Sequence, residues 1–193
     1  KGKDVISLWN QFEKVDMFAS LDSWGERAEF IRHGCDWKTV VNNLKRVQRE
    51  APHVVIDFNA VVSLFNVCTL TDFFDELISE GLLDPYKTRS TLYRAISPAP
   101  LTVRVLDKKT KDNAKEKIRK WLEQFPTPPH HLIYLLNDIM AYLDEDHSHL
   151  QVESKNNIAR TFNPFTLINP KTIDNCIVEQ HAAMTSGDQG WAN

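Results

Sequence analysis

The apolar residues in the first half of the chain fall into short continuous runs and longer stretches with helical spacing. The run 15–22 is apolar and ends in small polar residues, as buried strands do where they emerge at a sheet edge. The segment 53–66 is rich in β-branched and aromatic residues, and Asp57 is its single charged residue, so it predicts a second buried strand. The segments 88–97 and 101–107 also have strand-like composition, but their arginines predict less buried strands.

Stretches with helical spacing separate these strands. Asp36 is placed to cap a first turn, and the helical pattern after it stops before Pro52. The apolar positions of this predicted helix are Trp37, Val40, Val41, Leu44 and Val47. Thr69 and Asp72 have the spacing of a capping box, and the apolar face that follows them ends at Gly81. This half of the chain therefore predicts strand, helix, strand and helix in turn.

From Lys108 onward the pattern is mostly helical. The apolar face of the first predicted helix is formed by Ile118, Trp121, Leu122 and Phe125. A second helix is expected after the two prolines Pro128 and Pro129, since proline is favoured at helix starts. The tail from Thr161 is polar and contains further prolines, so we expect its end to be mobile unless a partner holds it.

The alternation of strands and helices predicts parallel β-α-β units joined by right-handed crossovers. We therefore expect an α/β fold, either a partial (β/α) barrel or an open parallel sheet of about three to four strands, followed by a helical C-terminal region. The β-α units occupy residues 1–107, and the helices and the tail occupy 108–193. The length of 193 residues allows one domain, or one domain with a helical appendage.

The composition excludes several classes of protein. The chain carries 26 acidic and 23 basic residues, a net charge of -3, which makes nucleic acid a poor partner. No run approaches the roughly 18 apolar residues of a membrane span, and the N-terminus lacks the apolar block of a signal peptide. Cys35, Cys68 and Cys176 are odd in number and widely spaced, which predicts reduced thiols. We therefore expect a cytoplasmic protein without a membrane anchor.

Polar side chains follow the first two predicted strands, and ligands of parallel sheets bind beyond the carboxyl ends of the strands. Ser20 and Asp22 end the first strand, and Ser63 and Asn66 end the second. Their hydroxyl, carboxylate and amide groups are suited to hydrogen-bond a ribose or an amino-acid group. The alternative is that they only cap the following helices or shape the loops.

Other clusters of charged or reactive side chains do not define a catalytic or metal-binding site. The loop 23–34 holds glutamates, arginines and a histidine, which is typical either of an ion-paired lid or of a solvated short helix. The cluster 144–149 contains metal-capable side chains, but its spacing matches no zinc or calcium signature, so we assign no metal. The cysteines lie in no recognisable reactive context and the glycines form no phosphate-binding loop, so we assign no catalytic residue.

Two stretches resemble the later half of a radical S-adenosylmethionine protein of the type with a twitch C-terminal region. They are MFASLDSWGERAEFIRHGCDWKTVVNNLKRV and VVIDFNAVVSLFNVCTLTDFFDELISEGLL. The resemblance implies that these stretches are the fourth and fifth β-α units of a six-unit partial barrel, with TRSTLYRAISP as the sixth. It also implies that Ser20 and Asp22 contact the ribose or methionine of the cofactor and that Asn66 adds a further contact. The likeness covers about the first 120 residues and fades beyond about residue 126.

The sequence departs from this family because it lacks the CxxxCxxC loop that holds a [4Fe-4S] cluster. The resemblance therefore implies a fragment, inactive alone, whose full-length parent binds S-adenosylmethionine and the cluster while this chain retains neither. The alternative is a non-catalytic α/β protein-interaction domain. An open half-barrel leaves a strand edge unpaired, so we expect its own helices or a second copy of the chain, in a homo-oligomer, to cover that edge.

Overall fold

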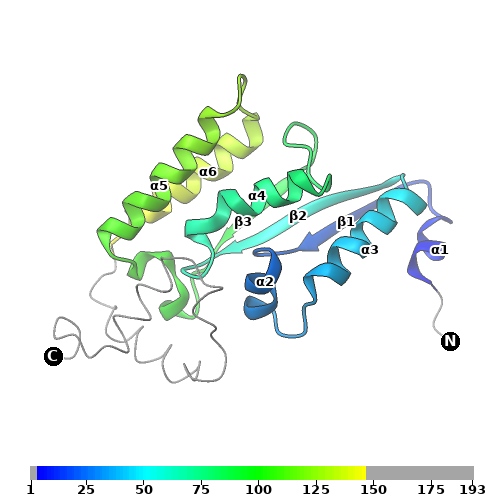
Figure 1. Ribbon diagram of the computed structural model, residues 1–193, viewed down its shortest axis with the longest axis horizontal. Coiled ribbons are helices and arrows are strands. Elements are labelled where there is room, and N and C mark those ends of the chain that lie inside the picture. Colours follow the sequence, from blue (N-terminus) through cyan, green and yellow to red (C-terminus); the bar gives the residue numbers. More distant parts are fainter. Residues whose placement is uncertain (1–3, 147–193) are drawn as a thin grey trace.

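The computed structural model describes residues 4–146, which form a parallel sheet and a set of helices (Figure 1). The strands are β1 (Val15–Ser20), β2 (Val54–Val62) and β3 (Ser90–Arg94). The α-helices are α1 (Val5–Trp9), α2 (Gly25–Ile31), α3 (Trp37–Glu50), α4 (Leu70–Ser79), α5 (Lys108–Glu123) and α6 (His130–Asp144). The fold is therefore mixed α/β with helices in its C-terminal part, as the sequence predicts. The expectation of a mobile tail concerns residues outside the described part.

The sheet has the strand order β1-β2-β3, and both pairs of neighbours are parallel. β1 pairs with the first part of β2, where Val15 lies opposite Val54, and β3 pairs with the second part, where Phe58 lies opposite Ser90. Each crossover moves to the next strand in the same direction, and right-handed crossovers of this kind place their helices on one face. Figure 1 shows α3 and α4 together in front of the sheet.

The face of the sheet beneath α3 and α4 forms the main core. Alternate residues of β2 point toward the helices, and Phe58 is 2% exposed there. The residues that pack with Phe58 include Ala60, Val62, Val41, Leu44, Phe73, Phe74 and Leu77. This core continues through Trp121 and Leu136, so α5 and α6 share it with the sheet.

A second, smaller core lies at the start of the sheet. Ile6 of α1 packs there with Val47 and Ala51 at the end of α3 and with Val54 at the start of β2. Trp9, Val15, Met17 and Ile56 lie around it. α1 is thus held against the beginning of β1 and β2.

The opposite side of the sheet is largely uncovered by residues 4–146, and we call it the open face. The strand register places Asp16, Phe18, Ser20, Val55, Asp57, Asn59, Val61, Thr91 and Tyr93 on this side. Phe18, Val61 and Tyr93 remain 55%, 40% and 52% exposed. Sheets made only of parallel strands are usually covered on both faces, whereas residues 4–146 pack helices on one face of this sheet.

Two of the three helix ends predicted from capping residues agree with the structure. The Asp36 carboxylate accepts a hydrogen bond from the Thr39 backbone N–H at 3.3 Å, which confirms the predicted start of α3. Gly81 has a φ of +69°, the left-handed conformation that ends α4. The predicted capping box at Thr69 is wrong, because its hydroxyl donates to the Asn66 carbonyl oxygen at 3.3 Å instead. Thr69 belongs to a short 3-10 turn, Val67–Thr69, that leads into the helix.

The strand expected at 101–107 is also absent from the described fold. This segment forms two 3-10 turns, Ala99–Leu101 and Val103–Val105. The two prolines before it lack the N–H groups that a strand ladder needs. The Thr102 hydroxyl and the Tyr142 hydroxyl lie 2.5 Å apart, so the segment is fixed to α6 rather than to β3.

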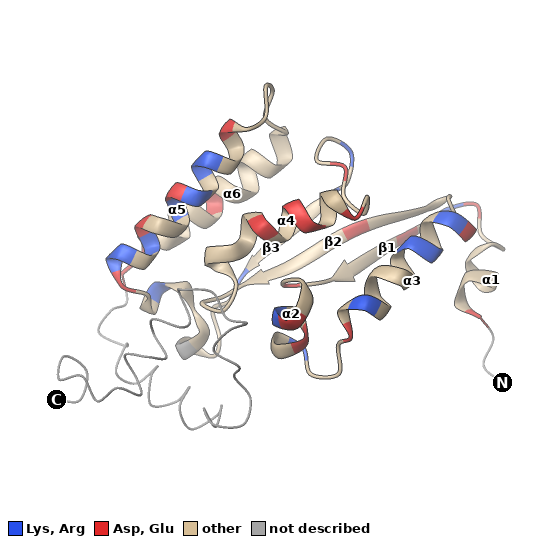
Figure 2. Cartoon of the chain, in the orientation of Figure 1, with Lys and Arg blue, Asp and Glu red and all other residues tan. Residues whose placement is uncertain are grey.

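The helices α5 and α6 differ strongly in charge. Figure 2 shows lysines and arginines alternating with acidic residues along α5, whereas α6 carries few charges. The Trp121 indole N–H on the apolar side of α5 donates to Asp75 Oδ1 of α4 at 2.7 Å. Within residues 4–146, no helix has both the length and the apolar character that a membrane crossing requires.

Alanine substitutions of two phenylalanines on neighbouring strands test the one-sided cover of the sheet. We expect Phe58→Ala to lower the free energy of unfolding by about 3–5 kcal/mol, because it leaves a cavity in the main core. We expect Phe18→Ala, on the open face, to change it by about 0.5 kcal/mol or less. Urea denaturation of both variants measures the difference. Similar losses would show that the open face is buried in solution.

Candidate functional site

Asp22 lies just beyond the carboxyl end of β1, and each oxygen of its buried carboxylate accepts a hydrogen bond. Oδ1 accepts a hydrogen bond from the Val61 backbone N–H at 2.8 Å, and Oδ2 accepts one from Arg32 Nε at 2.8 Å. The first bond joins the end of β1 to β2, and the second joins it to the residue that follows α2. Asp22 therefore fixes the position of three segments.

Asn66 completes this connection from the other side. Its amide Nδ2 donates to the carbonyl oxygens of Asp22 at 2.7 Å and Val61 at 2.8 Å. Its Oδ1 accepts from the Ser63 backbone N–H at 2.8 Å, and Ser63 Oγ accepts from the Phe65 N–H at 3.2 Å. Asn66 is buried and uses both amide hydrogens and its oxygen on backbone groups.

The structure thus brings Asp22, Ser63 and Asn66 together, as the positions at the strand ends predict. Their polar atoms shape the loops after β1 and β2, which is the alternative that the sequence left open. Ser20 lies outside this hydrogen-bond network. It is exposed on the open face, where the register places it beside Asn59, and Asn59 in turn beside Thr91.

The loop 23–34 contains α2, and two of its arginines reach inward. Arg27 Nη1 donates to the Phe65 carbonyl oxygen at 2.8 Å, and Arg32 holds Asp22. Glu29 Oε1 accepts from the Trp37 backbone N–H at 3.0 Å. These contacts tie the loop to its surroundings, so it is neither a simple solvated helix nor a detached lid.

A polar row in the middle of the open face was not singled out by the sequence. Asp57 is 1% exposed, and the Arg89 guanidinium lies 2.6 Å from its Oδ2. Arg89 also lies 3.3 Å from Asp16 Oδ1, so it bridges carboxylates of β1 and β2. Asn59 Oδ1 is buried and has no hydrogen-bond partner. The available signal was the period-two spacing of two polar residues, 57 and 59, within an apolar strand.

The two described cysteines differ in their chemical state. Cys35 is a free, partly buried thiol, and burial, followed by the charge of Glu29, raises its pKa. Cys68 is disulfide-bonded, so the expectation of reduced thiols is wrong for this residue. Within residues 4–146, no three His, Cys, Asp or Glu side chains are grouped to hold a metal ion. Of the cluster 144–149, residues 147–149 lie outside the described part.

Comparison of the chain with protein-family models, with curated proteins and with solved structures finds no match.

Asn66→Asp tests the role of the buried amide. The substitution replaces two donors by a carboxylate oxygen facing two carbonyl oxygens, so we expect a loss of at least about 2 kcal/mol in the free energy of unfolding. Asn42→Asp, at an exposed position of α3, is the control and should cost about 0.5 kcal/mol or less. Thermal and urea denaturation measure both. Equal small losses would mean that the Asn66 hydrogen bonds add no stability.

Proposed function

We propose that this chain forms part of the wall of a β/α barrel that binds S-adenosylmethionine, and that it does not catalyse radical chemistry by itself. The observation that carries the proposal is the arrangement of the sheet, in which consecutive strands are neighbours and α3 and α4 lie on one face.

This arrangement supports a barrel segment over a doubly wound sheet. A doubly wound sheet reverses its strand order at a switch point and carries helices on both faces. A barrel wall keeps one order, places its helices outside and directs the other face of its strands into the barrel. The open face of β1, β2 and β3 corresponds to that inner surface.

Polar residues in the middle of the open face fit a ribose or an amino-acid group. Asn59 Oδ1 is a buried acceptor without a partner, which suits a hydroxyl or ammonium donor of the cofactor. Ser20 and Thr91 flank it in the same row. In this proposal Ser20 and Asn59 contact the cofactor, while Asp22 and Asn66 act as positioning residues because their side chains hold the strand ends.

The residues of this chain do not fit an iron-sulfur cluster. Cys35, Cys68 and Cys176 are too widely spaced to clasp one, and the chain contains no CxxxCxxC sequence. Radical cleavage of S-adenosylmethionine needs an electron from such a cluster. We therefore assign the chain binding and positioning of the cofactor, and no catalytic step.

The alternative is a non-catalytic α/β interaction domain. The exposure of the register neighbours Val61 and Tyr93 favours it, since exposed apolar surface marks interaction sites. A second copy of the chain is the simplest occupant for such a surface.

Isothermal titration calorimetry with S-adenosylmethionine tests the first proposal. Because the chain lacks the cluster, it should not retain the cofactor through purification, and we expect only weak binding in the titration. Asn59→Ala should weaken this binding about fivefold further, because one hydrogen bond of about 1 kcal/mol is lost. Asn42→Ala, on the exposed side of α3, is the matched control and should leave the affinity unchanged. The absence of any binding by the unaltered chain would contradict the proposal.

Light scattering coupled to size-exclusion chromatography tests the alternative. Self-association through the open face predicts a dimer, and Tyr93→Asp should convert it to a monomer by placing a charge on the apolar surface. Tyr134→Asp is the control, because Tyr134 is an exposed tyrosine of α6 and lies on no sheet face. A monomer at all concentrations would rule out self-association.

A further inference from the structure

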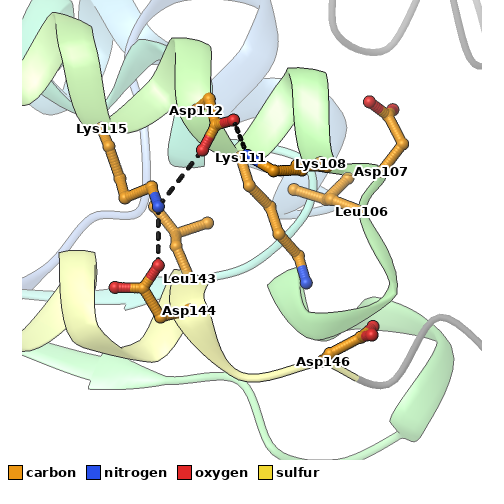
Figure 3. Close-up of a pocket in the computed structure, with 9 residues that line it drawn as sticks. All are labelled: Leu106, Asp107, Lys108, Lys111, Asp112, Lys115, Leu143, Asp144 and Asp146. Carbon is orange, nitrogen blue, oxygen red and sulfur yellow. Dashed lines mark hydrogen bonds and ion pairs between the residues drawn. The ribbon is translucent and has the colours of Figure 1, made fainter.

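A cavity of about 400 Å³ lies between the first turns of α5 and the end of α6, distant in sequence from the strand ends (Figure 3). Three lysines of α5 and four aspartates line it, together with Leu106 and Leu143. Its volume falls in the range of sites for small ligands. The three lysines differ in what their amines contact.

Two of the lysines are held in ion pairs. Lys115 Nζ lies 2.6 Å from Asp144 Oδ1 and 3.3 Å from Asp112 Oδ1, and Lys108 Nζ lies 2.5 Å from Asp112 Oδ2. The hydrogen bond to Asp144 is the main reason why the pKa of Lys115 is raised above its ordinary value. Such contacts keep an amine protonated and remove its nucleophilic electron pair.

Lys111 is in a different situation. The residue is 7% exposed, and its Nζ donates to the Glu145 carbonyl oxygen at 2.8 Å. Among the described residues, no carboxylate forms an ion pair with it at 4 Å or less, and Figure 3 shows its side chain extending away from Asp112. An ammonium has three N–H donors, so this single hydrogen bond leaves two of them able to bind a ligand.

The charges around Lys111 act in both directions. Burial is the main cause that lowers the pKa of Lys111, and the charge of Lys115 lowers it further. Asp146, Asp107 and Asp144 oppose this change, and the net direction is downward. At a given pH, a larger fraction of Lys111 than of an ordinary lysine is therefore neutral. Buried lysines become nucleophiles in this way.

We propose that Lys111 is a nucleophilic amine that binds a small aldehyde or ketone in this cavity as an imine. The neutral Nζ attacks the carbonyl carbon, and the resulting carbinolamine loses water to form the C=N bond. The carbonyl oxygen leaves in that water with both hydrogens of the neutral amine, so the step needs no oxidant or reductant. This site is independent of the proposed cofactor site on the sheet.

Reductive labelling of the whole chain with acetaldehyde and cyanoborohydride tests the proposal. Brief labelling at neutral pH, followed by peptide mass spectrometry, gives the rate at each lysine. We expect Lys111 to label faster than Lys108, which is exposed, and faster than Lys115, which lines the same cavity in ion pairs. The ratio of Lys111 to Lys108 should fall as the pH rises toward the ordinary lysine pKa, because Lys108 then also becomes neutral.

The competing explanation is that Lys111 only fixes the end of α6 through Glu145. In that case Lys111 labels more slowly than Lys108 at every pH, which would overturn the proposal. Lys111→Arg keeps the positive charge and donors but loses the nucleophile, so labelling at position 111 should disappear while the melting temperature is retained. Lys115→Arg is the matched control and should leave the labelling of Lys111 above that of Lys108.

Discussion

The hand of parallel crossovers determines where the helices around this sheet lie. Because each right-handed connection leads to the next strand in the same direction, α3 and α4 are brought to one face. The apolar residues of β2, such as Phe58, then face the helices, while Asp57 and Asn59 face the opposite side. The open face, its polar row and its exposed aromatic residues all result from this constraint.

Local signals predicted much of the fold. Asp36 and Gly81 mark helix ends by chemistry that acts within one turn, and the apolar segment 53–66 contains β2 because a central strand needs apolar residues on the face toward the core. The segment 101–107 was predicted incorrectly, since strand-like composition says nothing about available ladder partners. There the contact that decides the conformation joins Thr102 to Tyr142, which lies 40 residues away.

The sequence predicted that Asp22 and Asn66 lie close together, but not which groups their polar atoms contact. The ends of parallel strands share one edge, so Asp22 and Asn66 were expected to lie together. Their polar atoms are occupied by backbone groups such as the Val61 N–H, which donates to Asp22. The strand register that brings these groups together cannot be read from the sequence. The pairing of Asp57 with Arg89 likewise requires the register of β2 and β3. A lysine-rich helix such as α5 is typically solvated, so the burial of Lys111 carried no signal in the sequence.

The two separate cores have a consequence for how the molecule opens. β1 pairs with Val54–Asn59 and β3 with Phe58–Val62, so only two residues of β2 have partners on both sides. The small core around Ile6 stabilises the end of β2 that β3 does not reach. Local opening of that end, with α1 and the start of β1, would therefore break the contacts of the small core and leave the ladder between β2 and β3 paired.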